Sequence, residues 1–269
     1  MARSINLVAL AAGLACILAG CESAPSPSPA LPALHIGVDS AAAPLVTALS
    51  SAYENQFPGF VMSVEIHERG ALVDGARSGA FDGCVLFGND QAELEFQTPI
   101  GYAALAIVAA PKQTISDIRG ENLRAVYQGA IVNWRELGGV DAPIQPVAWP
   151  HQTSERLAFD SALAIGGSVT TNARIVTTRD QLAQLLRADS TAIGYYASFE
   201  QIDGDSHVLS IDNVLPPTAG QARNDYRLRV PLVIVSAHDP EGAFKEFLDW
   251  VLSPEGQRIV ARYSSRLND

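Results

Sequence analysis

Residues 127–139 read Tyr-Gln-Gly-Ala-Ile-Val-Asn-Trp-Arg-Glu-Leu-Gly-Gly and form the most distinctive stretch of the chain. Trp134 and Leu137 are expected to pack in the hydrophobic core. Gly138 and Gly139 are expected to form a turn that needs positive φ, which glycine adopts without steric cost. We therefore expect these residues to determine the fold without touching a ligand.

Strand and helix patterns alternate on both sides of this stretch. Short apolar runs predict buried strands, alternation predicts a further strand at residues 61–66, and apolar residues at helical spacing predict the helices between them. The expected strands cover residues 34–38, 61–66, 104–110 and 231–235, and the expected helices cover 44–57, 123–127 and 182–186. Strands separated by helices indicate an α/β protein.

Two helix starts are expected near the C-terminus. Asp239 is predicted to be an N-cap, with Pro240 at the first helical position. Ser253 and Pro254 repeat this chemistry and predict a second helix.

The first twenty residues indicate export. Arg3 is their only charge, and residues 6–18 are almost wholly apolar. That run is too short to span a bilayer and is typical of a signal peptide. It ends in Leu-Ala-Gly-Cys at Cys21, which resembles the bacterial lipobox; in that family the cysteine is diacylated and becomes the new N-terminus. We expect a lipoprotein signal peptide over 1–20; the alternative is an ordinary secretory signal with a chance cysteine.

Residues 21–33 alternate proline with serine and alanine, a composition typical of a semi-extended tether. The folded part then begins near Leu34. Loss of residues 1–20, whose one charge is Arg3, changes the formal net charge from −11 to −12. So acidic a chain argues against nucleic acid as a partner, but not against a small anion.

The chain contains three cysteines. Cys16 leaves with the signal peptide and Cys21 is the expected lipidation site, so Cys84 is left alone. No intrachain disulfide is then available, and Cys84 is expected to be a small core residue. The spacing of histidines and cysteines predicts neither a metal site nor a cofactor.

Three segments resemble the phosphate-binding proteins of ABC transporters. These are residues 127–139, Ala-Ile-Gly-Tyr at 192–195 and Leu-Ser-Pro-Glu-Gly-Gln at 252–257. Their order and spacing match that family, and the similarity covers nearly everything from Leu34 onward.

The resemblance implies a periplasmic binding protein of type II, with two α/β lobes. Lobe one would hold residues 34–108 and 226–269, and lobe two residues 109–225. Ligand would lie in the cleft between the lobes, which would close by a hinge motion.

In that family three loops bind phosphate through hydroxyls and backbone N–H groups at helix starts. In the first loop Ser40 matches the phosphate-binding hydroxyl and Ala41 a neighbouring amide; a plain N-cap is the other interpretation of Ser40. The second loop, residues 68–72, offers Arg69 and Gly70 in place of the usual serine. A surface arginine is the other interpretation of Arg69, and the one that the sequence favours.

The third loop, residues 149–156, departs most from the family pattern. Thr153 and Ser154 keep hydroxyls at a helix start, and Arg156 would restore positive charge if it turned inward. The family's arginine, aspartate and threonine are replaced by Trp149, His151 and Glu155. Glu155 would repel a dianion in the cleft, whereas a carboxylate in the first turn of a helix is favourable in itself.

The family also uses a buried aspartate that accepts a proton from phosphate. Phe87 occupies that position here, and the nearest carboxylate is Asp90. The residues therefore predict the fold more firmly than the ligand.

We expect a monomeric, lipid-anchored binding protein of the cell envelope that carries phosphate or a similar oxyanion to an ABC permease. A second hypothesis is a degenerate receptor for another solute, in which Trp149 stacks on the ligand, or a sensor or scaffold. A third is a hydrolase that uses His151 and Ser154, for which the sequence shows neither a nucleophile elbow nor metal-ligand spacing.

Overall fold

The computed structural model describes residues 33–88, 94–166, 169–198, 206–217 and 224–267. Residues Leu31–Asp269 form one compact unit. The predicted signal peptide, Cys21, nearly all of the tether and Asp90 lie outside the described residues. Within the described part, no helix is both long and apolar enough to cross a membrane.

Strands and helices alternate along the chain, as the sequence predicts. The strands are β1 (Ala33–Val38), β2 (Val61–Ile66), β3 (Gly83–Phe87), β4 (Phe96–Ala109), β5 (Asp117–Ile118), β6 (Gln145–Ala148), β7 (Arg174–Ile175), β8 (Ala192–Ala197), β9 (His207–Ile211) and β10 (Arg229–Ser236). The helices are α1 (Ala43–Gln56), α2 (Arg69–Ser78), α3 (Gly120–Gln128), the 3-10 turn η1 (Trp134–Leu137), α4 (Ser154–Ala162), α5 (Arg179–Ala188), α6 (Gly242–Leu252) and α7 (Pro254–Tyr263).

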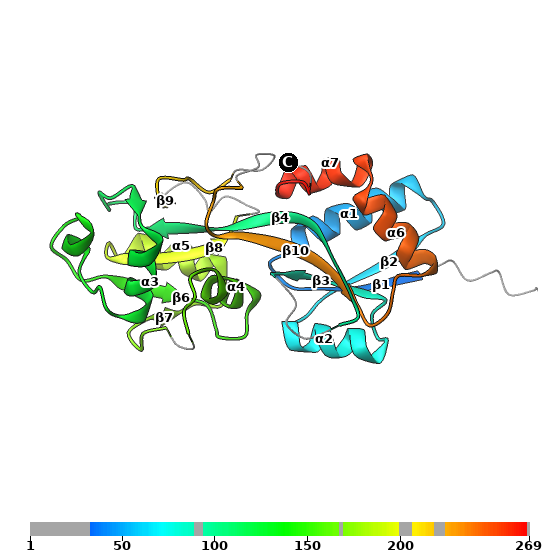
Figure 1. Ribbon diagram of the computed structural model, residues 1–269, viewed down its shortest axis with the longest axis horizontal. Coiled ribbons are helices and arrows are strands. Elements are labelled where there is room, and N and C mark those ends of the chain that lie inside the picture. The colour runs from blue at the N-terminus through cyan, green and yellow to red at the C-terminus, as the bar shows by residue number, and fades with distance from the viewer. Residues whose placement is uncertain (1–32, 89–93, 167–168, 199–205, 218–223, 268–269) are drawn as a thin grey trace, which may run out of the picture. The chain divides into compact units, whose positions relative to one another are not determined.

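The strands form a mixed sheet in the order β2-β1-β3-β10-β4-β8-β6-β7, with β5 and β9 attached beside β4. Helices α1, α2, α6 and α7 surround β1–β3 in one lobe, and α3, α4 and α5 surround β6–β9 in the other (Figure 1). The fold is therefore the two-lobed α/β arrangement that the resemblance implies.

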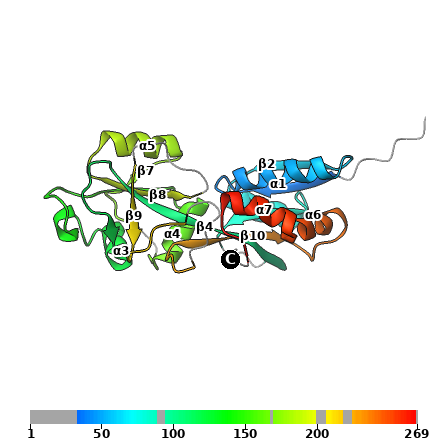
Figure 2. The ribbon, with the colours of Figure 1, turned by 90° about the horizontal axis from the view of Figure 1, so that it is seen from above.

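Two long strands, β4 and β10, run through both lobes (Figure 2). Along residues 96–104, β4 pairs with β10, and along residues 105–109 it pairs with β8. The change of partner lies between Ala104 and Leu105. A hinge between the lobes must bend these shared strands or the loops beside them.

The stretch that suggested the fold packs as predicted. Trp134 is fully buried, and its indole N–H donates to the Thr191 carbonyl at 2.9 Å. Leu137 is partly buried against the same core. Gly138 ends η1 with φ = 84°, the positive φ that the turn requires.

Aromatic stacking fixes the position of α4, whose start faces the cleft. The Phe159 ring stacks on Tyr195 at 3.8 Å between centroids and contacts Tyr127 edge-on at 4.6 Å. All three side chains are fully buried. Helix α4 is therefore anchored in the core of lobe two.

Two local predictions were wrong. Residues 68–72 are not a loop, because α2 already begins at Arg69. Helix α6 begins at Gly242, with Glu241 rather than Asp239 as N-cap. The Ser236 hydroxyl donates to the His238 carbonyl, and this turn places the first residue of the helix further along the chain. The Ser253 cap is confirmed, since its hydroxyl accepts from the Gly256 amide. Cys84 is buried as predicted.

We expect Phe159→Ala to lower the free energy of unfolding by about 3–5 kcal/mol, because it leaves a cavity between Tyr127 and Tyr195. Urea unfolding followed by tryptophan fluorescence would measure this. Leu157→Ala is the matched control on α4: its side chain is 37% exposed, and the change should cost less than about 1 kcal/mol. Equal losses in the two variants would contradict the assigned packing.

Candidate functional site

Two helix starts, one from each lobe, open onto one cavity. Asp39 and Ser40 come from the loop between β1 and α1, and Thr153 and Ser154 come from the start of α4. The cavity measures about 280 Å³, and its remaining lining residues are Ile66, His67, Glu68 and Arg69. The structure thus brings together four of the residues predicted from the sequence: Ser40, Arg69, Thr153 and Ser154.

A second opening adjoins this cavity through Ser40, Glu68 and Thr153. It measures about 320 Å³ and is also lined by Trp149, Pro150, Gln152, Glu155 and Thr177. Trp149 is only 5% exposed, and its indole N–H donates to the Tyr195 carbonyl at 2.8 Å. Its ring is therefore held largely within the core and offers little surface for stacking on a ligand.

Asp39 is the central polar residue of the site, and the sequence analysis assigned it no role. Its carboxylate accepts from the Phe87 amide at 2.5 Å, the Ala42 amide at 3.0 Å and the Ser154 hydroxyl at 2.9 Å. The bond to Ser154 links lobe one to lobe two. Burial raises the pKa of Asp39, although all three donors act in the opposite direction.

Glu155 is the second buried carboxylate of the site. It follows Ser154 in the first turn of α4, and its side chain is 7% exposed. Burial raises its pKa to about 7, with the charges of Asp39 and Glu68 acting in the same direction and Arg179 opposing them. Glu155 is therefore the first-turn carboxylate considered from the sequence, and the structure shows in addition that it is buried.

Ser40 and Thr153 play different parts. Thr153 is the N-cap of α4; its hydroxyl accepts from the Arg156 amide and donates to the Pro150 carbonyl. The N-cap interpretation of Ser40 is wrong, because Ala42 occupies that position in α1. Asp39 satisfies the Ala42 amide instead, which leaves the Ser40 side chain exposed within the cavity.

The other predicted ligand residues lie nearby. Ala41 is buried in the core. Gly70 lines an open depression of about 680 Å³ beside the cavity, together with Arg69 and His151. Arg156 is 5% exposed; its Nε donates to the Asp160 carboxylate at 2.8 Å, and its Nη1 donates to the Trp149 carbonyl. These bonds support the loop before α4, so positive charge at the cleft comes chiefly from Arg69.

The cavity combines hydrogen-bond donors with acceptors. The hydroxyl of Ser40 and the guanidinium of Arg69 can donate to a ligand, whereas Asp39 and Glu155 accept when ionised. Such a set suits an oxyanion that carries at least one proton of its own. Among the described residues no group of three or more histidine, cysteine or acidic side chains is placed to hold a metal ion.

The predicted proton-accepting position is filled by Phe87, which is fully buried. Asp39 supplies a buried carboxylate beside it from another part of the chain. The signal for Asp39 was present in the sequence, as an acidic residue between a buried strand and a helix start. Its bond to Ser154 could not be derived from that pattern.

We expect Glu155→Gln to stabilise the protein at pH 8 more than at pH 5. The pKa of Glu155 is higher in the folded state than in the unfolded state, because burial disfavours its charged form. The free energy of unfolding of the wild type therefore falls as the pH rises from the ordinary pKa of a glutamate through about 7. The variant removes this loss, which is worth roughly 3 kcal/mol at pH 8. Urea unfolding at the two pH values measures it. Glu121→Gln, an exposed change in the first turn of α3, should show no such pH difference.

Comparisons with known proteins agree with this geometry. A family model described as the PBP superfamily domain matches residues 23–255. The phosphate-binding protein PstS of Bacillus subtilis (strain 168) is 26% identical over 249 residues, which cover 89% of this chain and 81% of that protein.

Solved structures show the same fold. A structure from Clostridium perfringens with bound phosphate, described as a candidate phosphate ABC transporter substrate-binding protein, superposes with a TM-score of 0.77 at 23% identity. An ABC-type phosphate transport receptor from Vibrio cholerae superposes with a TM-score of 0.76 at 20% identity. Each match covers 87% of this chain and 99% of the other. The resemblance found in the sequence is confirmed, and because the family model spans most of the chain, this protein belongs to the PBP superfamily.

Proposed function

We propose that this protein is an extracytoplasmic, lipid-anchored solute-binding protein that binds phosphate or a related small oxyanion for an ABC importer. The observation that carries the proposal is the cavity shared by Ser40 and the start of α4, on opposite lobes of a periplasmic binding protein fold. The positive end of a helix dipole and the amides of a helix start favour an anion. The relatives named as phosphate-binding proteins support this ligand class.

The two buried carboxylates decide which form of the ligand fits. Near neutral pH inorganic phosphate carries at least one proton, and its O–H group can donate to Asp39 or Glu155. Burial raises the pKa of Glu155 to about 7, which reduces its repulsion of an anion near neutral pH. A fully deprotonated dianion such as sulfate would meet the same carboxylates without a hydrogen bond to offer.

The same carboxylates favour one alternative. Asp39 and Glu155 place negative charge where a phosphate receptor needs donors, and a degenerate receptor with another cargo would account for them. This second candidate keeps the fold and the cleft but changes the ligand.

A hydrolase finds less support. Its nucleophile would be Ser154, whose hydroxyl donates to Asp39 Oδ2, whereas His151 lines the outer depression beside Gly70. The relatives are binding proteins for transport rather than enzymes.

The proposed location follows from the sequence before residue 34. Lipid on Cys21 would hold the protein at a membrane surface, and residues 21–33 would lift the folded part toward the periplasmic or extracellular side. A monomer would then deliver its ligand to a membrane-bound permease.

Isothermal titration calorimetry of the full-length chain with phosphate tests the proposed ligand. We expect Ser40→Ala to weaken phosphate binding about tenfold, because it removes a hydrogen bond to a charged group. Ser51→Ala, an exposed change on α1 away from the cavity, should leave binding unchanged. No heat with phosphate, arsenate or sulfate at millimolar concentration would defeat the proposal.

A separate experiment tests the anchor. We expect Cys21→Ser to move the protein from the membrane pellet to the soluble envelope fraction and to abolish labelling with radioactive palmitate, because the thiol that would carry the lipid is gone. Cys84→Ser is the control, since this cysteine is buried in lobe one. An unlabelled wild-type protein would leave Cys21 without its proposed role.

A further inference from the structure

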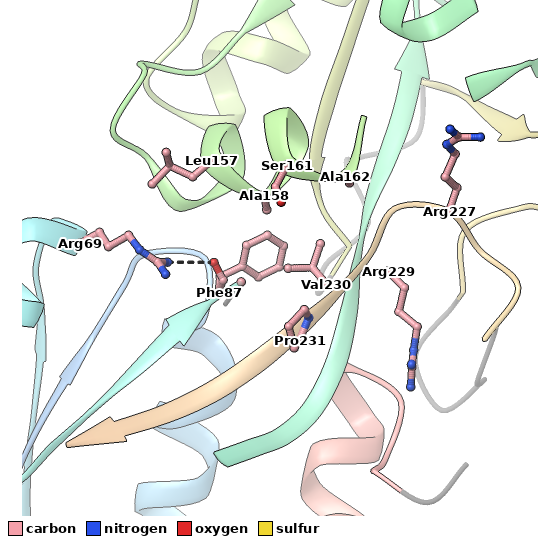
Figure 3. A pocket seen from close by; sticks show the side chains of 11 residues that line it. Arg69, Phe87, Leu157, Ala158, Ser161, Ala162, Arg227, Arg229, Val230 and Pro231 are labelled. Atoms are coloured by element: carbon pink, nitrogen blue, oxygen red, sulfur yellow. Dashed lines mark hydrogen bonds between the residues drawn. The ribbon is translucent and has the colours of Figure 1, made fainter. Parts of the chain in front are cut away.

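A second cavity shares Arg69 with the first but is not lined by Ser40. It measures about 270 Å³, and its wall is formed mainly by Phe87, Leu157, Ala158, Val230 and Pro231 (Figure 3). It also has arginines at its edge, but Arg227 and Arg229 extend away from Phe87 toward Asp212 and the Tyr102 ring. The wall formed by Phe87, Leu157, Ala158, Val230 and Pro231 is therefore apolar, while Arg69 and Ser161 add polar groups to the lining.

Small residues keep this cavity open. Gly88 follows β3 with φ = 101°, and a Cβ atom there would lie 3.8 Å from the Cβ of Ala158 and 3.9 Å from Val230. A larger residue at position 88 or 158 would project into this space. The cavity thus depends on the choice of glycine and alanine at two facing positions.

The apolar cavity adjoins the oxyanion cavity. Arg69 lines both, and its Nη1 donates to the Phe87 carbonyl at 3.3 Å. The Phe87 amide donates to Asp39, which also accepts from Ser154. On α4, Ser154 faces the first cavity, and Ala158, one helical turn later, faces the second. About 5–6 Å along the helix separates the two environments.

We infer that the cleft is built for an oxyanion that carries a short apolar substituent, such as an alkylphosphonate. This inference rests on the proposed function. The oxyanion group lies against Ser40 and Thr153, and a chain of about three carbons passes Arg69 to reach Phe87 and Ala158. A single organic substituent leaves the phosphonate its own O–H group near neutral pH, so it can still donate to Asp39 or Glu155.

The expected signature is a dependence of affinity on chain length. Each methylene buried against Phe87, Ala158 and Val230 should tighten binding about fourfold. Propylphosphonate has two more methylenes than methylphosphonate, so it should bind the full-length wild-type protein about fifteenfold more tightly in calorimetric titrations. Inorganic phosphate is titrated in parallel to test the oxyanion cavity alone.

A substitution in the apolar cavity then tests where the carbon chain of the ligand lies. Ala158→Leu fills the cavity with a side chain, so the affinity ratio of propylphosphonate to methylphosphonate should fall to about one. Ala188→Leu, the same change at an exposed position of α5, should keep the wild-type ratio. The chain-length series in the wild type stands on its own should Ala158→Leu not fold.

Three results would overturn the inference. If phosphate binds but propylphosphonate binds no more tightly than methylphosphonate, the ligand is inorganic and the proposed function stands. If the ratio survives in a folded Ala158→Leu variant, the chain lies elsewhere. If neither phosphate nor any phosphonate binds, the proposed function fails and this inference fails with it. A ratio of about fifteenfold that Ala158→Leu abolishes and Ala188→Leu preserves would establish the organic subsite.

Discussion

The buried carboxylate of Asp39 holds the two sides of the cleft together. Moving a charged carboxylate out of water is costly unless hydrogen bonds compensate, and Asp39 receives three. They come from the end of β3, the start of α1 and the start of α4. One side chain thus fixes the positions of three elements that meet at the cavity. The remaining geometry of the site follows from where those elements end.

This arrangement gives the cleft an unusual balance of charge. Helix starts and Arg69 provide positive potential, whereas the buried carboxylates of Asp39 and Glu155 provide hydrogen-bond acceptors in the adjoining cavities. The pKa of each carboxyl group is raised by burial, so the protonation state of the site is sensitive to what enters it. A ligand able both to accept and to donate hydrogen bonds meets fewer unsatisfied groups here than one that can only accept.

Much of the fold could be predicted from the sequence, because it depends on local patterns. Apolar runs such as that around Ile107 indicate strands wherever they occur. Trp134, followed by Gly138, indicated a short turn packed against the core. The site was harder to predict, because its chemistry depends on residues distant in sequence. Ser154 and Asp39 are 115 positions apart, and neither residue reveals that contact by itself. Glu155 has the pattern of a first-turn carboxylate, which the structure confirms, but only the packing of the two lobes shows that it is buried.

The path of the chain through the sheet has a consequence for how the protein matures. Strand β3 is buried along its whole length, and it pairs with β1 on one edge and with β10 on the other. All of lobe two is synthesised between β3 and β10, so the apolar second edge of β3 stays open until nearly the whole chain is available. Open apolar edges invite pairing with other chains. Truncation products that stop before residue 229 would therefore be prone to aggregate. Once β10 pairs with β3, this edge is no longer available to other chains.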